Sequence, residues 1–295
     1  MRRLKGAHPI NGSKVFDFFN VVIVSIFTLL IIVPILNILA SSFASNTALA
    51  KGDFIFFPSE FTLDNYKAVL NDPTISRAFL ISVSKTVIGV VTHVTFCAMV
   101  AYGLSKPDLK FRKLYTAIGV FTMYFSGGMI PYYLLIKSLG LRNNFLVYII
   151  PALFSYYDVV VLMNFFRQIP ASLEESATID GAGPWTVFIK IILPLSKPAL
   201  ATIALFNGVN QWNDFMTAKL YVTDETLWPL QMKLYEIIVQ SQASSTNVVG
   251  SVVLSTTTKG IQLATIVVTT VPILIIYPLL QKHFVTGMML GAVKE

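Results

Sequence analysis

The chain has 295 residues, of which 55% are hydrophobic and only 13% are charged, and its mean hydropathy is +0.69. Soluble domains carry about 25% charged residues. This composition excludes a soluble globular fold, because the apolar residues gather in runs of roughly the 20 residues that cross a bilayer core. The sequence therefore predicts an all-α, multi-pass membrane protein. Its net charge of +7 is explained by orientation in the membrane rather than by a nucleic-acid partner.

Six apolar segments are predicted to span the membrane. They cover residues 18–39, 75–101, 114–136, 145–166, 198–220 and 261–281. The first segment follows a basic N-terminus, as the core of a signal peptide does, but its apolar run is longer than the roughly 7 to 15 residues of such a core. We therefore expect an uncleaved span. The fifth segment is the least apolar, so it is either a pore-lining helix or no span at all.

The loops between these segments differ in their content of Lys and Arg. Thirteen Lys and Arg residues lie in the N-terminal segment, residues 102–113, residues 167–197 and the C-terminal tail, whereas eight lie in or beside the segments on the other side, which include the longer residues 44–74 and 221–260. Because basic residues are retained on the cytoplasmic side, both termini are predicted to be cytoplasmic. Within the last external segment, the polar stretch of residues 241–247 has no hydrophobic periodicity and is predicted to be a mobile loop.

The cytoplasmic loop of residues 167–197 carries the start and stop signals of two short helices. Ser172 and Glu175 form a capping-box pattern, which predicts a helix start. Asp180-Gly181 predicts the end of that helix, because glycine accepts the left-handed conformation found just past a last turn. Gly183-Pro184 predicts the start of the second helix. The first helix should present an apolar surface suited to a groove in another protein, formed by Leu173, Ala177 and Ile179. A helix lying on lipid headgroups is the alternative, but the acidic first turn suits it poorly.

The same loop resembles the EAA signature of ABC-importer permeases. The match consists of residues 175–177, Gly181 and residues 191–194 at the family's spacing, with Ser176 where the family usually has alanine. The resemblance covers most of the chain. Pro58 with residues 61–66, and the tail at 284–294, look like the carbohydrate importers related to the maltose permease. The similarity is greatest to the LplC-type branch, whose members are associated with oligosaccharide and polysaccharide uptake, and it extends to the second permease subunit of alginate importers.

This resemblance implies a type I ABC-importer permease: a single domain of residues 1–295 in the bacterial cytoplasmic membrane, with a coupling helix between spans four and five. It implies coupling to an ATPase through Glu175, Ala177, Asp180, Gly181, Leu193 and Pro194. The implied partners are two ABC ATPase subunits, which hold ATP and Mg, a second permease that is a paralogue or another copy, an external solute-binding protein and a saccharide. This chain has no Gly-Lys dipeptide and hence no P-loop, so we expect no catalytic residue, metal or cofactor in it.

Polar residues at membrane depth are the candidates for the substrate pathway. In the fifth span they recur at offsets of three, four and seven, so they share one helical face: Asn207, Asn210, Gln211 and Asp214. With the nearby Trp212, and with Tyr156 and Asp158 of span four, they offer the amide, carboxylate and aromatic groups that suit sugars. Hydrogen bonding between helices is the alternative role.

Three further residues of the second span, Lys85, His93 and Cys97, are assigned no role in transport on the basis of the sequence. Lys85 could pair with Asp158 or extend its ammonium to the outer interface. His93 is interpreted as a packing histidine, and Cys97, the single cysteine, as a small buried hydrophobe.

Three rival functions are weighed against the importer. An ion-coupled secondary transporter would place paired acids on broken helices, and only Asp158 partly qualifies. An intramembrane enzyme would need a nucleophile with its base or metal ligands, and the spans contain neither HExxH nor GxSxG. An ABC permease for a non-sugar solute stays open.

Overall fold

The computed structural model describes residues 11–51, 56–58, 60–246, 259–276 and 278. Its regular elements are helices, and among the described residues the one strand-like feature is an isolated bridge between Ala44 and Phe61. The chain divides into two compact units, Met1–Val69 with Ser241–Val267 and Leu70–Gln240 with Val268–Glu295. The candidate sites lie in the second unit.

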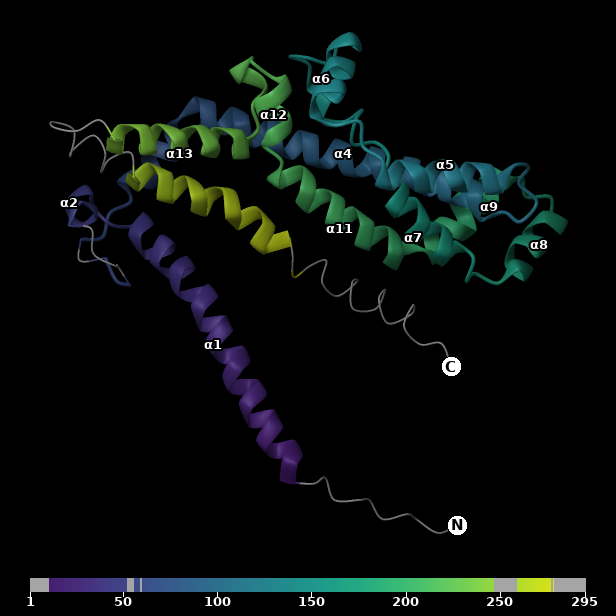
Figure 1. Cartoon of the computed structure of the whole chain (residues 1–295), viewed down its shortest axis with the longest axis horizontal. Helices are drawn as coiled ribbons and strands as arrows, with labels where there is room; N and C mark the ends of the chain where they lie inside the picture. The colour runs from purple at the N-terminus through teal and green to yellow at the C-terminus, as the bar shows by residue number, and fades with distance from the viewer. Residues whose placement is uncertain (1–10, 52–55, 59, 247–258, 277, 279–295) are drawn as a thin grey trace. The chain divides into compact units, whose positions relative to one another are not determined.

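The described helices follow one another in chain order (Figure 1). They are α1 (Asn11–Ser42), α2 (Asn46–Ala50), α3 (Asp64–Asn71), α4 (Pro73–Ser105), α5 (Arg112–Tyr124), α6 (Met129–Ser138), η1 (Phe145–Tyr148), α7 (Tyr156–Phe166), α8 (Ala171–Ile179), α9 (Pro184–Val187), η2 (Phe188–Ile192), α10 (Leu193–Leu195), α11 (Lys197–Asn213), α12 (Met216–Tyr221), η3 (Glu225–Leu227), α13 (Leu230–Thr246) and a last helix, Lys259–Ile276.

Three of these helices are long and apolar enough to cross a membrane: the Lys14–Ser42 part of α1, the whole of α4, and Lys259–Ile276. Two bent pairs reach that length only together, α5 with α6 at 115° and the segment α9 to α10 with α11 at 78°. The described residues therefore hold three to five candidate spans, which confirms the multi-pass helical class. The count of six stays a prediction, as does the end of the sixth span, since 277 and 279–281 lie outside the described residues together with the tail at 284–294.

Two predicted spans are interrupted for visible reasons. Span three breaks after Tyr124, where Gly127 and Gly128 follow and Gly128 takes a φ of +87° that favours glycine. Span four is a short 3-10 helix, η1, and the eleven-residue α7, with Pro151 in the segment between them. By contrast, α13 extends to Thr246, so the loop predicted at 241–247 is wrong as far as that residue.

The first unit is held together around the motif at residues 61–66. Asn65, which is buried, donates its side-chain amide to the carbonyl oxygens of Ser42 and Ala44, at 3.1 Å each. The hydroxyls of Ser42 and Tyr66 are 2.6 Å apart. Gly260 lies against the Asn65 side chain, where a Cβ would come within 2.4 Å of the amide oxygen. The motif therefore has a structural role in joining α3 to the end of α1.

The second unit is built around α4, which packs against both α11 and α7 (Figure 1). Its main hydrophobic core contains Cys97 of α4 and Leu162 of α7, which are both fully buried, and Phe188 of η2. Cys97 is thus the buried residue that the sequence predicts. Gly119 lets α5 approach this core, because a Cβ at that position would lie 2.0 Å from the ring of Tyr156. Core side chains pack at crystal-like density, which leaves no room for such an atom.

Candidate functional site

The predicted coupling loop forms the two helices expected of it, but the first helix begins differently. Helix α8 starts at Ala171, with Pro170 at its N-cap position and no side chain accepting a hydrogen bond from its free amides. Ser172 therefore lies inside the first turn, and the capping box with Glu175 is wrong. Pro170 sets the entry of the chain instead, with a φ of −57° and a ψ of 127°. The side chain of Glu175 is exposed.

The end of α8 is the glycine turn that the sequence predicts. Gly181 has a φ of +82°, and its amide donates to the carbonyl of Thr178 at 3.0 Å. The amide of Ala182 donates to the carbonyl of Ala177 at 2.9 Å. These two bonds form a Schellman motif, which satisfies carbonyls at the helix end and fixes the direction of the next segment. Asp180 is the C-cap residue of the same turn.

After this turn the chain returns to the membrane segment through a second bend. Helix α9 starts at Pro184, as predicted, and the π-helical turn η2 joins it to α10, which contains Leu193 and Pro194. Leu193 packs partly against the main core, whereas Pro194 is exposed. The bend of 78° between α10 and α11 follows directly. The loop thus has one fixed turn in its middle, at Gly181, and a sharp bend at its end, before α11.

An ion pair that sequence reasoning missed ties α8 to the end of α4. The ammonium of Lys106 donates to the carboxylate of Glu174 and lies 4.3 Å from the ring centre of Tyr102, whose hydroxyl donates to the same carboxylate at 3.3 Å. Burial lowers the pKa of Lys106, but its hydrogen bonds to Glu174 and Tyr102 outweigh burial and raise that pKa. No spacing signal in the sequence joins residues 68 positions apart.

The apolar surface predicted on α8 is partly formed. Ile179 is 86% exposed and Leu173 is 42% exposed, while Ala177 is half-buried against the main core and does not belong to the surface. Trp185, which is 64% exposed, adds a large apolar group from α9. Exposed side chains of this size on a short loop are typical of a surface that binds another protein.

The polar face predicted on the fifth span lines a cavity of about 270 Å³. Its walls include Asn207, Asn210, Gln211 and Asp214, together with Tyr132, Tyr148, Thr217 and Tyr221. The amide nitrogen of Gln211 donates to the carbonyl of Tyr148 at 3.1 Å, which fixes its orientation. The amide oxygen of Asn207 is buried and has no partner among the described residues, so it is an unused acceptor in the cavity wall.

A second cavity of about 570 Å³ shares two walls with the first, Tyr132 and Tyr221. It lies at the break between α5 and α6 and includes Gly127 and Gly128. Tyr221 stacks on Tyr133, with ring centres 5.8 Å apart, and meets Tyr132 edge-on at 6.4 Å. The polar cavity therefore lies beside a cluster of tyrosine rings. Sequence reasoning did not find this cluster, because its three tyrosines come from α6 and α12, which are far apart in the sequence.

Lys85 pairs with Asp214 and not with Asp158. Its ammonium is fully buried, donates to the backbone carbonyl of Asp214 at 2.7 Å, and lies 3.5 Å from the carboxylate. It also lies 4.9 Å from the ring centre of Tyr148. The predicted alternative, in which the ammonium extends to the outer interface, is wrong as well, because the side chain has no exposed surface.

Asp158 pairs instead with His93. The two side chains are 2.9 Å apart, and the other ring nitrogen of His93 donates to the carbonyl of Ala152 at 2.7 Å. Lys85 and His93 are eight residues apart on α4, which is about 12 Å along a helix, so each meets a different acid. His93 is thus the satisfied packing histidine that the sequence predicts. It supports a cavity wall through Ala152.

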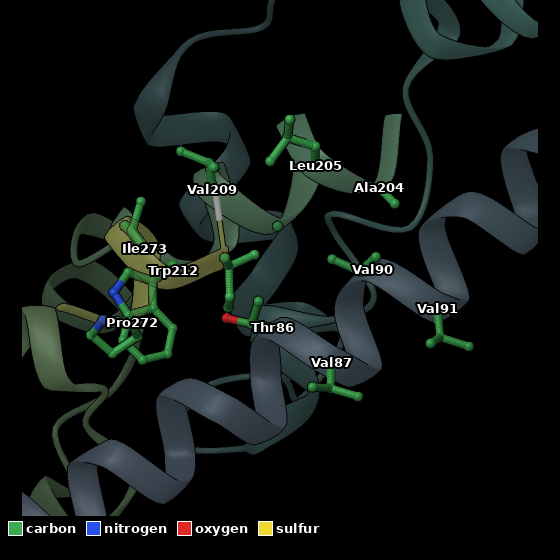
Figure 2. A pocket seen from close by; sticks show the side chains of 12 residues that line it. Thr86, Val87, Val90, Val91, Ala204, Leu205, Val209, Trp212, Pro272 and Ile273 are labelled. Atoms are coloured by element: carbon green, nitrogen blue, oxygen red, sulfur yellow. The ribbon is translucent and has the colours of Figure 1, made fainter. Parts of the chain in front are cut away.

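Three predicted pathway residues do not line the polar cavity: Asp158, which pairs with His93, and Trp212 and Tyr156, which lie elsewhere. Trp212 is next to Gln211 in sequence, and this rotates it about 100° around α11 into an apolar cavity of about 290 Å³ between α4, α11 and the last helix (Figure 2). There its ring nitrogen donates to the carbonyl of Thr269 at 3.1 Å. Tyr156 is buried in the main core beside Gly119. Neither side chain lines the polar cavity.

The comparisons with known proteins agree with one another. The chain is 43% identical to the protein LplC of Bacillus subtilis (strain 168), over the whole of both chains. It is 41% identical to the polygalacturonan/rhamnogalacturonan transport system permease protein YtcP of the same strain, over 96% of this chain and 99% of YtcP. No protein-family model matches. A crystal structure of a bacterial ABC transporter involved in the import of the acidic polysaccharide alginate matches with a TM-score of 0.86 and 33% identity, over 95% of this chain and 100% of that one.

The chain belongs to the permease subunits of carbohydrate ABC transporters. A carbohydrate ABC permease is a transport subunit, so the intramembrane enzyme and the ion-coupled secondary transporter are both wrong interpretations. Among the residues that the structure describes, no three His, Cys, Asp or Glu side chains come together as metal ligands. The polar cavity and the loop of residues 167–197 are therefore the candidate sites in this chain.

Proposed function

We propose that this permease forms half of the translocation pathway of a bacterial importer for oligosaccharides or polysaccharide fragments. The observation that carries the proposal is full-length similarity above 40% to permeases such as YtcP, joined to a cavity lined by amides and tyrosines. Amides donate and accept hydrogen bonds with sugar hydroxyls, and tyrosine rings pack on the apolar faces of pyranoses. The name of YtcP refers to polygalacturonan and rhamnogalacturonan, and the matching structure to the acidic polysaccharide alginate, which supports a saccharide substrate.

The proposed topology has six spans with both termini in the cytoplasm of the host. In this topology α5 and α6 form one span, the segment from η1 to α7 forms the fourth, and α11 with α12 forms the fifth. The concentration of basic residues at 102–113 and 167–197 supports it, because these segments then lie on the cytoplasmic side. The proposed location is the cytoplasmic membrane.

The loop of residues 167–197 is proposed to couple the permease to two separate ABC ATPase subunits, which bind ATP and Mg. Ile179 and Trp185 would enter a groove of the ATPase, and the exposed Glu175 would lie at its rim. Asp180 and Gly181 fix the turn between the two helices, while Leu193 and Pro194 join the loop to α11. The Lys106–Glu174 pair supports this role, since it would pass a displacement of α8 directly to α4.

A second permease and a solute-binding protein complete the proposed assembly. The large exposed apolar surface of α1 is suited to lipid or to other membrane helices, which supports a second permease beside this one. Purification of the tagged permease from its native membrane tests this assembly. We expect an ABC ATPase, a second permease and a solute-binding protein to co-purify. Recovery of the permease without any nucleotide-hydrolysing protein would contradict the proposal.

The substrate pathway is proposed to pass along Asn207, Asn210, Gln211 and Asp214. Replacing Asn210, which is exposed in the cavity, with leucine removes hydrogen-bonding groups from the wall. Saccharide uptake by the reconstituted transporter at subsaturating substrate should fall about tenfold, since a lost hydrogen bond is worth roughly 1 kcal/mol or more. Asn213→Leu is the matched control, because Asn213 is exposed on the same helix but does not line the cavity. Equal uptake by the two variants would contradict the assignment.

A further inference from the structure

A fourth cavity, of about 1,110 Å³, lies outside the proposed pathway and the coupling helices. It is formed by the loop after α4, by α5 from Arg112 to Phe121, and by the end of α7. Its volume exceeds the roughly 300–1,000 Å³ of most small-molecule pockets. None of the four proposed pathway residues of α11 and its C-cap, Asn207, Asn210, Gln211 and Asp214, lines it.

Three cations stand at one end of this cavity. Arg112, Lys113 and Arg167 line it, and none of them forms an ion pair with an acidic residue in the part of the chain that the structure describes. Among the described residues, the guanidinium of Arg167 donates to the carbonyl of Leu104, at 3.4 Å, and to the sulfur of Met163, at 3.1 Å. Burial and the nearby charge of Arg112 lower the pKa of Arg167, so the two guanidinium groups repel each other without an anion between them.

The opposite end of the cavity is apolar. Val120 and Phe121 lie eight and nine residues beyond Arg112 on α5, which places them about 12 Å farther along the helix axis. Phe121 stacks on Phe125, with ring centres 5.0 Å apart, and extends the apolar wall. A ligand that fills the cavity must therefore be anionic at one end and apolar along the rest of its length.

We propose that this cavity binds one anionic phospholipid of the cytoplasmic leaflet, with its phosphate between Arg112, Lys113 and Arg167 and an acyl chain along Val120 and Phe121. The assignment to that leaflet rests on the proposed topology, in which residues 102–113 and 167 are cytoplasmic. Anionic lipids are concentrated in this leaflet, and basic residues near the membrane surface attract them. Because Arg167 is the first residue of the coupling loop, the lipid would brace the point where α7 enters it.

Lipid retention by the purified transporter tests the proposal. The delipidated complex is incubated with equal amounts of phosphatidylglycerol and phosphatidylcholine, and bound lipid is measured by native mass spectrometry. The wild-type complex should retain phosphatidylglycerol in preference to phosphatidylcholine. In Arg112→Gln/Arg167→Gln the affinity should fall about 30-fold, which corresponds to about fivefold for each cation removed.

Two control variants decide whether the cavity is responsible. Lys110→Gln removes a cation two residues from Arg112 that is exposed but does not line the cavity, and it should retain the lipid as the wild type does. Arg112→Lys/Arg167→Lys keeps both charges and should also retain it. Equal retention by all variants, loss in the lysine variant, or equal binding of phosphatidylcholine would each overturn the proposal. So would the absence of bound lipid in the wild type, the result expected if an acidic segment of a partner protein fills the cavity.

The topology is tested separately, because lipid retention in detergent does not depend on orientation. Asp108→Cys places an accessible thiol in the loop beside the cavity, and Cys97 is buried. In intact cells this thiol should react only with membrane-permeant reagents. Reaction with an impermeant reagent would refute the proposed topology and the choice of leaflet. The lipid site itself would still be decided by the retention experiment.

Discussion

Replacing Lys85 with methionine is expected to lower the midpoint of thermal unfolding by about 5 °C and to abolish saccharide uptake. The ammonium of Lys85 donates hydrogen bonds to both the carboxylate and the backbone carbonyl of Asp214, at the break between α11 and α12. Methionine fills a similar volume but leaves these acceptors without a donor, which costs roughly 1–3 kcal/mol. The break then loses the contact that holds Asp214 and Thr217 in the cavity wall.

Three comparisons isolate the contribution of this pair. Lys137→Met removes an exposed lysine from the last turn of α6 and should leave both stability and uptake unchanged. Lys85→Met/Asp214→Asn removes the uncompensated carboxylate as well, and it should recover part of the lost stability because a neutral amide is less costly to bury. The carboxylate of Asp214 is 28% exposed, so water limits the effect. If Lys85→Met unfolds at the wild-type temperature, the buried pair does not hold the break.

The helices and the polar face could be predicted because their signals are local. A run of apolar residues is sufficient to predict α1 and α4, and the spacing of three and four residues places Asn207, Asn210 and Asp214 on one face whatever the rest of the chain does. The Schellman turn at Gly181 is local in the same sense, since one glycine after a helical stretch determines it.

The pairing of charges could not be predicted because it depends on how the helices are rotated. Lys85 meets Asp214, 129 residues away, and not Asp158, which pairs with His93. A rotation of α4 by one residue would move Lys85 by about 100° around the helix and change its partner. Trp212 is a different case: sequence reasoning counted it among the pathway residues because it is adjacent to them in the chain, but one residue turns it about 100° around α11 from Gln211 and into the apolar cavity.

At the start of α8, the capping-box pattern of Ser172 and Glu175 is overridden by a nearby proline. Ser172 and Glu175 have the spacing of a capping box, but Pro170 lies two residues earlier, and its fixed φ starts the helix at Ala171. The serine is then past the N-cap position and cannot accept the hydrogen bonds of a cap. In the loop of residues 167–197, Pro170, Pro184 and Gly181 have restricted or unusual backbone angles, and they determine the path of the chain more than the capping residues do.

Replacing Gly181 with valine is expected to uncouple ATP hydrolysis from transport, provided that the loop couples the permease to the ATPase as proposed. Gly181 has a φ of +82°, which costs an L-residue about 1–2 kcal/mol and a β-branched residue more. Because a Cβ at Gly181 meets no atom within 4 Å, the strain is in the backbone and not in packing. The valine variant should therefore insert and assemble normally but turn α9 away from its position relative to α8, so that saccharide no longer stimulates the ATPase.

The control for this strain lies two residues away. Gly183 also has open space around it but a φ of −72° and a ψ of 164°, which valine adopts readily, so Gly183→Val should keep saccharide-stimulated ATPase activity. Gly181→Asn should keep most of it, since asparagine tolerates the left-handed conformation. Stimulated hydrolysis at the wild-type level in Gly181→Val would show that the ATPase does not sense the shape of this turn. If both valine variants lost the stimulated ATPase activity equally, the cause would be the added side-chain bulk at the surface that contacts the ATPase, because only Gly181 has a strained backbone.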